Sequence, residues 1–151
     1  MTCFNEFKKI KDSLPLGVSL LAVSKGHHPE SIRKLFRYGQ LDFGESRLQE
    51  AIPKKNHLND LNQIRWHFVG KLQKNKVRRV VKEFDFIHSV DSLSLIERIS
   101  RISQEEQKTP NIFLQVKFRD DPQKGGFSKQ DLLKSWSKIV SLKNINLIGL
   151  M

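Results

Sequence analysis

The sequence predicts an α/β fold in which a parallel sheet is covered by helices. Six short apolar runs alternate with stretches of helical periodicity along the 151 residues. In such an alternation each crossover returns the chain to the same strand direction, which produces a parallel sheet. Two architectures fit: a doubly wound open sheet, and a (β/α)8 barrel that is two units short. Length alone favours the open sheet, because a complete barrel usually takes about 250 residues.

The strands are expected where short apolar runs end in polar or glycine residues, and the helices where apolar residues recur at helical spacing. The expected strands are residues 18–23, 41–44, 64–70, 86–90, 111–116 and 145–151. The helix faces between them comprise Ile32, Leu35 and Phe36; Val77, Val80, Val81 and Phe84; Leu95, Ile96, Ile99 and Ile102; and Leu132, Leu133, Trp136, Ile139 and Val140.

Prolines refine two of the helices. An amphipathic helix with Phe4 and Phe7 on its apolar face precedes the first strand and is expected to end at Pro15. Pro53 lies inside a later helical pattern, where it removes one backbone donor. We therefore expect that helix to break or restart near Ile52.

Composition limits the class of protein. A hydrophobic share of 38% with ten Phe residues is enough for a folded core. The single cysteine, Cys3, cannot form an internal disulfide, which favours a reducing, cytoplasmic location. No run approaches the roughly 18 apolar residues of a spanning helix, and residues 1–11 carry charges where a signal peptide is apolar. We expect neither a membrane protein nor a secreted one.

The net charge of +11 is the one compositional feature that suggests a partner, since basic surfaces attract phosphates and nucleic acid. Its densest part comprises Lys71, Lys74, Lys76, Arg78, Arg79 and Lys82. Helical spacing spreads these cations around the side opposite Val77 and Val80, as on a solvated helix face. Few aromatic residues lie among them to stack on bases. A basic nucleic-acid-binding domain is therefore only an alternative hypothesis.

The chemistry is expected just past each strand, because ligands bind at the carboxyl ends of parallel strands in both architectures. Lys25 shares strand parity with Leu21 and Val23, so its side chain should point toward an interior where an ammonium is poorly solvated. Desolvation lowers the pKa of a lysine, and a neutral amine is what Schiff-base formation with pyridoxal phosphate requires. The alternative is a solvated lysine that begins a βα loop.

Other polar residues at strand ends support less specific hypotheses. His67 either contacts a ligand or satisfies a backbone group between strands. His88 and Asp91 suit structural roles at a strand end better than the roles of general acid and base. The histidines show no spacing that recurs with cysteines or paired carboxylates, so no metal site is expected. Two glycine-rich motifs bind nucleotides, G-x-G-x-x-G and G-x-x-x-x-G-K-[ST], and neither of them follows an expected strand.

Several blocks of residues, in order and at similar spacing from about residue 18 onward, resemble one known family. They are Ala22-Val23-Ser24-Lys25; Phe43-Gly44-Glu45 with Gln49-Glu50; Trp66-His67-Phe68-Val69-Gly70 with Leu72-Gln73 and Asn75-Lys76; and Gly149-Leu150-Met151. These blocks are similar to the pyridoxal phosphate homeostasis proteins, whose fold resembles the N-terminal barrel of alanine racemase. The resemblance implies that residues 1–151 form a single-domain (β/α)8 barrel, incomplete with about six βα units and lacking the last two strands.

The resemblance also implies a function. Pyridoxal 5'-phosphate would be held as an aldimine on Lys25, and the protein would carry or buffer the cofactor for apoenzymes without dedicated catalysis. The candidate cofactor-binding residues are Lys25, Ser46, His67 and Met151. Ser46 stands where the family usually has Asn, which shortens its reach and removes an amide donor.

A racemase-like enzyme is the alternative within the same cofactor chemistry. Racemization needs a second base, which alanine racemase takes from an additional domain. The only tyrosine of this chain, Tyr38, lies late in a predicted helix. The resemblance therefore favours a carrier over an enzyme.

Two more expectations concern loops and edges. The segment 119–127 resembles a glycine-containing loop of the family and is interpreted as a lid. The family continues past Met151 with two βα units whose loops would hold the phosphate of the cofactor. We therefore expect weak cofactor affinity in these 151 residues, together with exposed strand edges at both ends of the sheet.

Overall fold

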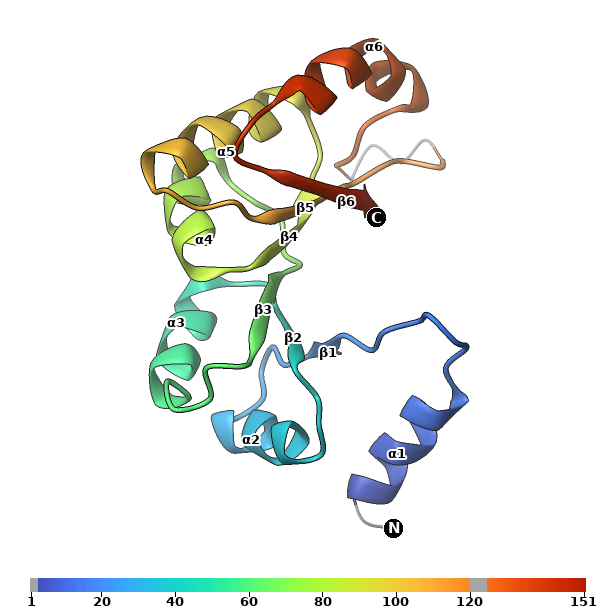
Figure 1. Ribbon diagram of the computed structural model, residues 1–151, viewed down its shortest axis with the longest axis vertical. Helices are drawn as coiled ribbons and strands as arrows, with labels where there is room; N and C mark the ends of the chain where they lie inside the picture. The colour runs from blue at the N-terminus through green and yellow to red at the C-terminus, as the bar shows by residue number, and fades with distance from the viewer. Residues whose placement is uncertain (1–2, 120–124) are drawn as a thin grey trace. The chain divides into compact units, whose positions relative to one another are not determined.

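The computed structural model describes residues 3–119 and 125–151 (Figure 1). The strands are β1 (Ala22–Val23), β2 (Asp42–Glu45), β3 (Arg65–Phe68), β4 (Phe86–Val90), β5 (Asn111–Leu114) and β6 (Asn146–Leu150). The helices are α1 (Cys3–Ser13), α2 (Pro29–Arg37), α3 (Leu48–His57), α4 (Val77–Glu83), α5 (Leu93–Glu105) and α6 (Lys129–Ser141), with a short 3-10 turn, η1 (Lys74–Lys76), before α4. The predicted alternation of strands and helices is confirmed.

The strand order distinguishes the two predicted architectures. The sheet runs β1-β2-β3-β4-β5-β6, and the pairs β1–β2, β3–β4, β4–β5 and β5–β6 are parallel. A doubly wound sheet reverses its strand order at a switch point, whereas a barrel keeps chain order. The open sheet that length alone favoured is therefore wrong, and the fold is an incomplete barrel.

The chain divides into two compact units, residues 1–66 and 67–151. In the first unit, Ile32, Phe43 and Ala51 are almost fully buried and join α2, β2 and α3. The predicted N-terminal helix is confirmed as α1, which packs its rings on Tyr38 with a centroid distance of 4.6 Å from Phe4. Tyr38 directly follows α2 and therefore lies at the C-terminal end of that helix.

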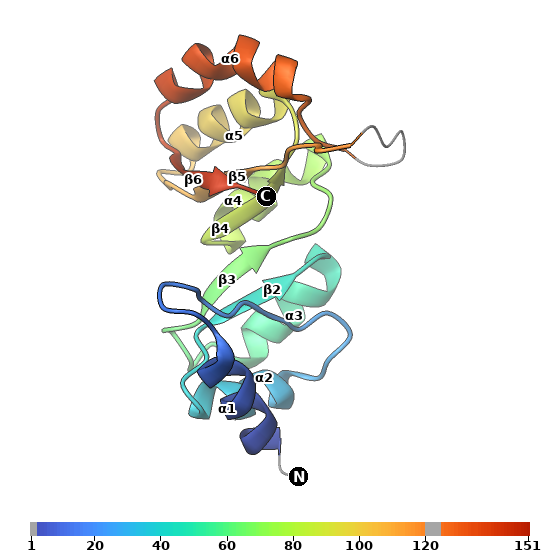
Figure 2. The same ribbon diagram turned by 90° about the vertical axis from the view of Figure 1, so that its right-hand side faces the viewer.

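In the second unit, α4 and α5 cover one face of the strands (Figures 1 and 2). That face presents the fully buried Ile87, Ile112 and Leu114. The helix faces predicted on α4 and α5 are buried throughout, as expected. Successive side chains of a strand point to opposite sides, so the half-buried Phe86 and His88 occupy the other face of β4.

One predicted helix boundary is wrong. We expected the chain to break near Ile52, but α3 continues through Pro53. A proline in a helix costs one hydrogen bond, to the carbonyl four residues earlier, and here that carbonyl belongs to the exposed Gln49 and can bind water. The buried side of the same helix, at Leu48, Ala51 and Lys54, holds it in place.

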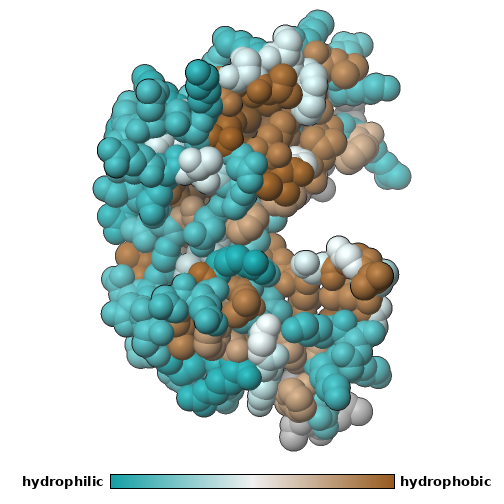
Figure 3. Space-filling model, viewed as in Figure 1, coloured by the Kyte–Doolittle hydropathy of each residue, from teal (hydrophilic) through white to brown (hydrophobic). Residues whose placement is uncertain are grey.

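Within the described ranges, β1 pairs only with β2 and β6 only with β5, so both ends of the strand order are open, as predicted. Val23 of β1 is 47% exposed and Leu150 of β6 is 54% exposed. Apolar side chains gather between β6 and α6 (Figure 3), around a hollow of about 320 Å³. The face predicted on α6 is only partly buried, because Ile139 is covered while Leu133, Trp136 and Val140 are exposed. Among the described elements, α6 packs against a neighbouring helix on one side only, at α5.

Candidate functional site

Lys25 lies at the tip of a tight turn that follows β1. The Ser24 carbonyl accepts a hydrogen bond from the His27 N–H at 3.1 Å, which closes a four-residue turn. Gly26 occupies the third position with a φ of 73°. A type II turn requires this left-handed conformation at its third position, where glycine adopts it without a steric penalty. The Lys25-Gly26 pair therefore fixes the shape of the turn.

This turn is bound to α3 at both of its corners. Before the lysine, the Ser24 carbonyl also accepts a hydrogen bond from Lys54 Nζ at 2.7 Å. After it, the Gly26 N–H donates to Glu50 Oε2 at 3.2 Å. The other Glu50 oxygen pairs with Arg47 at 3.3 Å. Both peptide groups that flank Lys25 thus have charged partners on one helix.

A buried carboxylate links the same turn to β2. Glu45 is fully buried, and its Oε1 accepts from Ser24 Oγ and from Lys54 Nζ, each at 2.7 Å. The other oxygen, Oε2, has no hydrogen-bond partner among the described residues. Ionised groups are rarely buried unless they are paired, so Glu45, Lys54 and Ser24 act as one unit.

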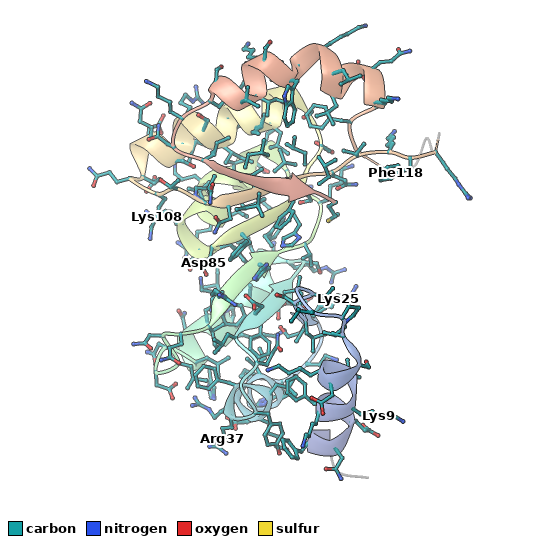
Figure 4. All side chains as sticks on the ribbon, turned by 45° about the vertical axis from the view of Figure 1, so that its right-hand side comes forward. Lys9, Lys25, Arg37, Asp85, Lys108 and Phe118 are labelled. Carbon is teal, nitrogen blue, oxygen red and sulfur yellow. The ribbon has the colours of Figure 1, made fainter. Side chains whose placement is uncertain are left out.

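The side chain of Lys25 is exposed, so the predicted burial of its ammonium group is wrong. We expected a poorly solvated ammonium, but Lys25 and Val23 on the same strand face are both exposed. The reason is that β1 ends at Val23, so Lys25 lies in the turn beyond the strand rather than on a strand face that points into an interior. Within the described part of the chain, the Lys25 amine has neither an ion pair nor a hydrogen bond. It projects from the first unit at the end away from Arg37 (Figure 4).

Ser46 follows β2 directly. The register pairs Ala22 with Phe43 and Val23 with Gly44, so Ser46 stands two residues past Gly44 as Lys25 stands two residues past Val23. Ser46 is half-buried. Its hydroxyl can donate or accept one short hydrogen bond to a ligand that reaches Lys25.

In the second unit, two histidines form a layer with two phenylalanines. His67 stacks on Phe86 with a centroid distance of 4.1 Å, and His88 stacks on Phe113 at 4.4 Å. The two imidazoles are joined by a 2.9 Å contact between His67 Nδ1 and His88 Nε2. Burial, and secondarily the proximity of His67, lowers the pKa of His88 to about 4. His88 is therefore neutral near pH 7, and one of the two contacting nitrogens donates while the other accepts.

The remaining predicted positions belong to loops and strand ends. Met151 extends the β6 pairing, since its N–H donates to the Leu114 carbonyl at 2.8 Å, and its side chain is 46% exposed. His88 pairs with His67 rather than with Asp91. Asp91 instead lies against Gly125, where a Cβ would be 2.6 Å from the carboxylate oxygen, so any larger residue there would require the Asp91 side chain to move. Most of the predicted lid, residues 120–124, lies outside the described residues.

The basic stretch has local partners. Arg78 pairs with Glu105 and Glu106, while Lys82 also reaches Glu106 at 3.3 Å. These contacts lower the pKa of Glu106 and raise that of Arg78, with the hydrogen bonds between them as the main cause. Much of this charge is therefore neutralised on the protein surface, as expected for a solvated helix face.

No group of three or more His, Cys, Asp or Glu side chains in residues 3–119 and 125–151 is arranged to hold a metal ion. Likewise, no helix in those residues has the length and apolar character needed to span a bilayer.

Sequence reasoning missed three residues of the first unit: Glu45, Glu50 and Lys54. Two of them stand in the blocks that carried the family resemblance, but their roles follow only from the contacts with Ser24 and Gly26. A sequence signal did exist, because Glu45 has the same strand parity as the apolar Phe43. A charged residue at a core position indicates a buried partner.

Replacing Gly26 with alanine is expected to lower the free energy of unfolding by about 1 kcal/mol. A Cβ at this position has open space around it, so the cost comes only from the positive φ. Asparagine, which tolerates this conformation, should cost less than alanine. Urea unfolding of the Gly26→Ala and Gly26→Asn variants measures both values. Equal stability of wild type and Gly26→Ala would contradict the assigned turn.

Comparison with known proteins places this geometry in a family. The family model of the alanine racemase N-terminal domain matches residues 4–151. A pyridoxal phosphate homeostasis protein of Synechocystis is 40% identical over 145 residues, which are 96% of this chain and 66% of the relative. The chain thus spans slightly less than two thirds of that relative.

Solved structures are also similar to this chain over nearly its whole length. PipY of Synechococcus elongatus without pyridoxal phosphate has a TM-score of 0.97 and 43% identity, over 99% of this chain and 70% of PipY. PipY with pyridoxal phosphate bound gives 0.94 and 41%, over 99% and 69%. The chain therefore belongs to the alanine racemase N-terminal domain family, and within that family it is similar to pyridoxal phosphate homeostasis proteins.

Proposed function

We propose that this chain binds pyridoxal 5'-phosphate at Lys25 and that the protein holds the cofactor without a dedicated catalytic reaction. The observation that carries the proposal is an exposed, unpaired lysine amine on a turn whose backbone is held at both corners. When bound, pyridoxal phosphate supplies an aldehyde that condenses reversibly with such an amine. The relative whose structure contains the cofactor, PipY, supports the choice of ligand.

The residues around Lys25 fit a phosphorylated aromatic aldehyde. Among the described residues, no carboxylate has to be displaced from the Lys25 amine, and Ser46 offers a hydroxyl just past the strand that pairs with β1. In the second unit, the aromatic layer of His67 and Phe86 offers a flat apolar surface, and Met151 lies at the end of β6. We propose Lys25, Ser46, His67 and Met151 as cofactor-binding residues, and residues 1–151 as part of a single barrel domain.

Absence of catalysis is part of the proposal. A racemase-like reaction would need a second base near Lys25, and the only tyrosine of the sequence, Tyr38, stands at the far end of α2, packed on Phe4. Incubation of the protein with single amino acid enantiomers tests this point. Turnover clearly above that of free pyridoxal phosphate would favour the enzyme.

The partners and location extend the same proposal. Pyridoxal-phosphate-dependent apoenzymes are the proposed recipients of the cofactor, and a cytoplasmic location is proposed because the sequence contains one cysteine. Nucleic-acid binding is not favoured, since Arg78 and Lys82 have carboxylate partners. A salt-sensitive gel shift at low ionic strength would reverse that preference.

Borohydride reduction tests the assignment of Lys25. After incubation with pyridoxal phosphate and reduction, peptide mass spectrometry is expected to find the pyridoxyl group on Lys25. The Lys25→Ala variant should lose the label, because no other lysine occupies this turn. Lys71→Ala, a change at an exposed lysine in the second unit, should keep it. A label on Lys71, Lys74 or Lys76 with Lys25 unmodified would refute the assignment.

A further inference from the structure

The turn that carries Lys25 has more support than its own hydrogen bonding requires. The His27 N–H already closes it through the Ser24 carbonyl, and Gly26 supplies the necessary φ. The two contacts from α3 are additional. One cation, Lys54, binds the peptide oxygen before the lysine, and one carboxylate, Glu50, binds the peptide N–H after it.

These two contacts differ in their surroundings. Lys54 is buried and also neutralises Glu45, so its loss would disturb the core of the first unit. Glu50 is only partly buried, with 34% of its side chain exposed, and its other partner is the exposed Arg47. Glu50 can therefore be changed without leaving a buried charge unpaired, and the effect on the turn can be separated from an effect on folding.

We propose that Glu50 is a positioning residue for Lys25: it fixes the Gly26 peptide so that the lysine amine is presented in a narrow range of directions. This inference rests on the proposed function at Lys25. A lysine has four rotatable side-chain bonds, and a fixed Cα removes the further freedom of the turn before any ligand binds. Loss of the Glu50 contact should thus weaken cofactor attachment more than it weakens the fold.

The charge of Glu50 and its hydrogen bond have opposite expected effects. A carboxylate near the turn repels an anionic phosphate ligand, so removal of the charge alone would favour binding. Removal of the hydrogen bond should disfavour it. Glu50→Gln keeps an acceptor oxygen and removes the charge, whereas Glu50→Ala removes both. Comparison of the two variants separates positioning from electrostatics.

The experiment titrates wild type, Glu50→Ala, Glu50→Gln and the control Arg37→Ala, at an exposed residue of the first unit away from Lys25, with pyridoxal phosphate, using the visible absorbance of the protein-bound cofactor. We expect half-saturation of Glu50→Ala at roughly fivefold higher concentration, the cost of one charge-assisted hydrogen bond at a partly exposed site. Glu50→Gln should stay at or below the wild-type concentration, and Arg37→Ala should match wild type. Thermal melting should change by only a few degrees in all of them.

Hydrogen exchange gives a second readout that does not depend on the cofactor. The Gly26 amide should exchange faster in Glu50→Ala than in wild type and Glu50→Gln. Equal half-saturation of wild type and Glu50→Ala, or an unchanged exchange rate at Gly26, would overturn the positioning role. Absence of a reducible label at Lys25 in wild type would instead overturn the proposed function, and with it this role, while the exchange rates would still report whether Glu50 holds the turn.

Discussion

Replacement of Lys54 by methionine is expected to lower the free energy of unfolding by about 3–5 kcal/mol. The change removes the cation that lies 2.7 Å from Glu45 Oε1 and leaves a carboxylate with no exposure to water. It also removes the donor to the Ser24 carbonyl. Methionine fills nearly the same volume, so the loss should come from the unpaired charge rather than from a cavity.

A double variant distinguishes the charge from the packing. In Lys54→Met with Glu45→Met both charges are absent, and the Ser24 hydroxyl retains the Gly44 carbonyl, 3.4 Å away, as an acceptor. We expect this variant to recover most of the lost stability, because apolar replacement of a whole buried ion pair is often neutral. Lys34→Met, at an exposed position of α2, is the control and should change stability by less than about 0.5 kcal/mol. Urea unfolding of all three measures these values. Similar destabilisation by the single and double variants would contradict the assigned ion pair.

The sequence predicted the regular parts of the fold because they obey local rules. The predicted apolar faces of α4 and α5 were confirmed, since apolar residues at helical spacing are buried wherever a sheet lies beneath them. The predictions were wrong where packing between elements decides whether a helix continues or a side chain is buried. A helix tolerated Pro53 because its opposite side is anchored, and the apolar face of α6 stayed partly exposed because it has a neighbour on one side only.

The candidate site, like the fold, could be predicted from the sequence only in part. Lys25 could be selected from its position after an apolar run, but its exposure could not be predicted, since the apolar pattern did not show that the strand ends at Val23 and that Lys25 lies in a turn. The support beneath it was also hidden. Pattern analysis treats charges as solvated, and Glu45 and Lys54 are nine residues apart on different elements, so only the fold shows that they meet.

The histidine layer makes stability depend on pH. His88 has a folded-state pKa of about 4, lowered from 6.5 mainly by burial. Between these values the unfolded chain binds a proton that the folded protein does not, so stability falls as the pH drops from about 6.5 to about 4. Because His88 is only half-buried, water partly screens its charge. We therefore expect this group to lower the free energy of unfolding by about 1–2 kcal/mol over this pH range.

The His88→Gln variant tests this assignment. Glutamine keeps a hydrogen-bonding group toward His67 and cannot become charged in this range. Carboxylates that titrate nearby, such as Asp60 and Glu106 with their lowered pKa values, are present in both proteins and cancel in the comparison. Urea unfolding at pH 7.5 sets the baseline difference between wild type and variant, because His88 is then neutral in both states. At pH 4.5 the wild type should have lost about 1–2 kcal/mol more than the variant. A difference that stays constant between the two pH values would mean that the imidazole of His88 is protonated as readily in the folded protein as in the unfolded chain.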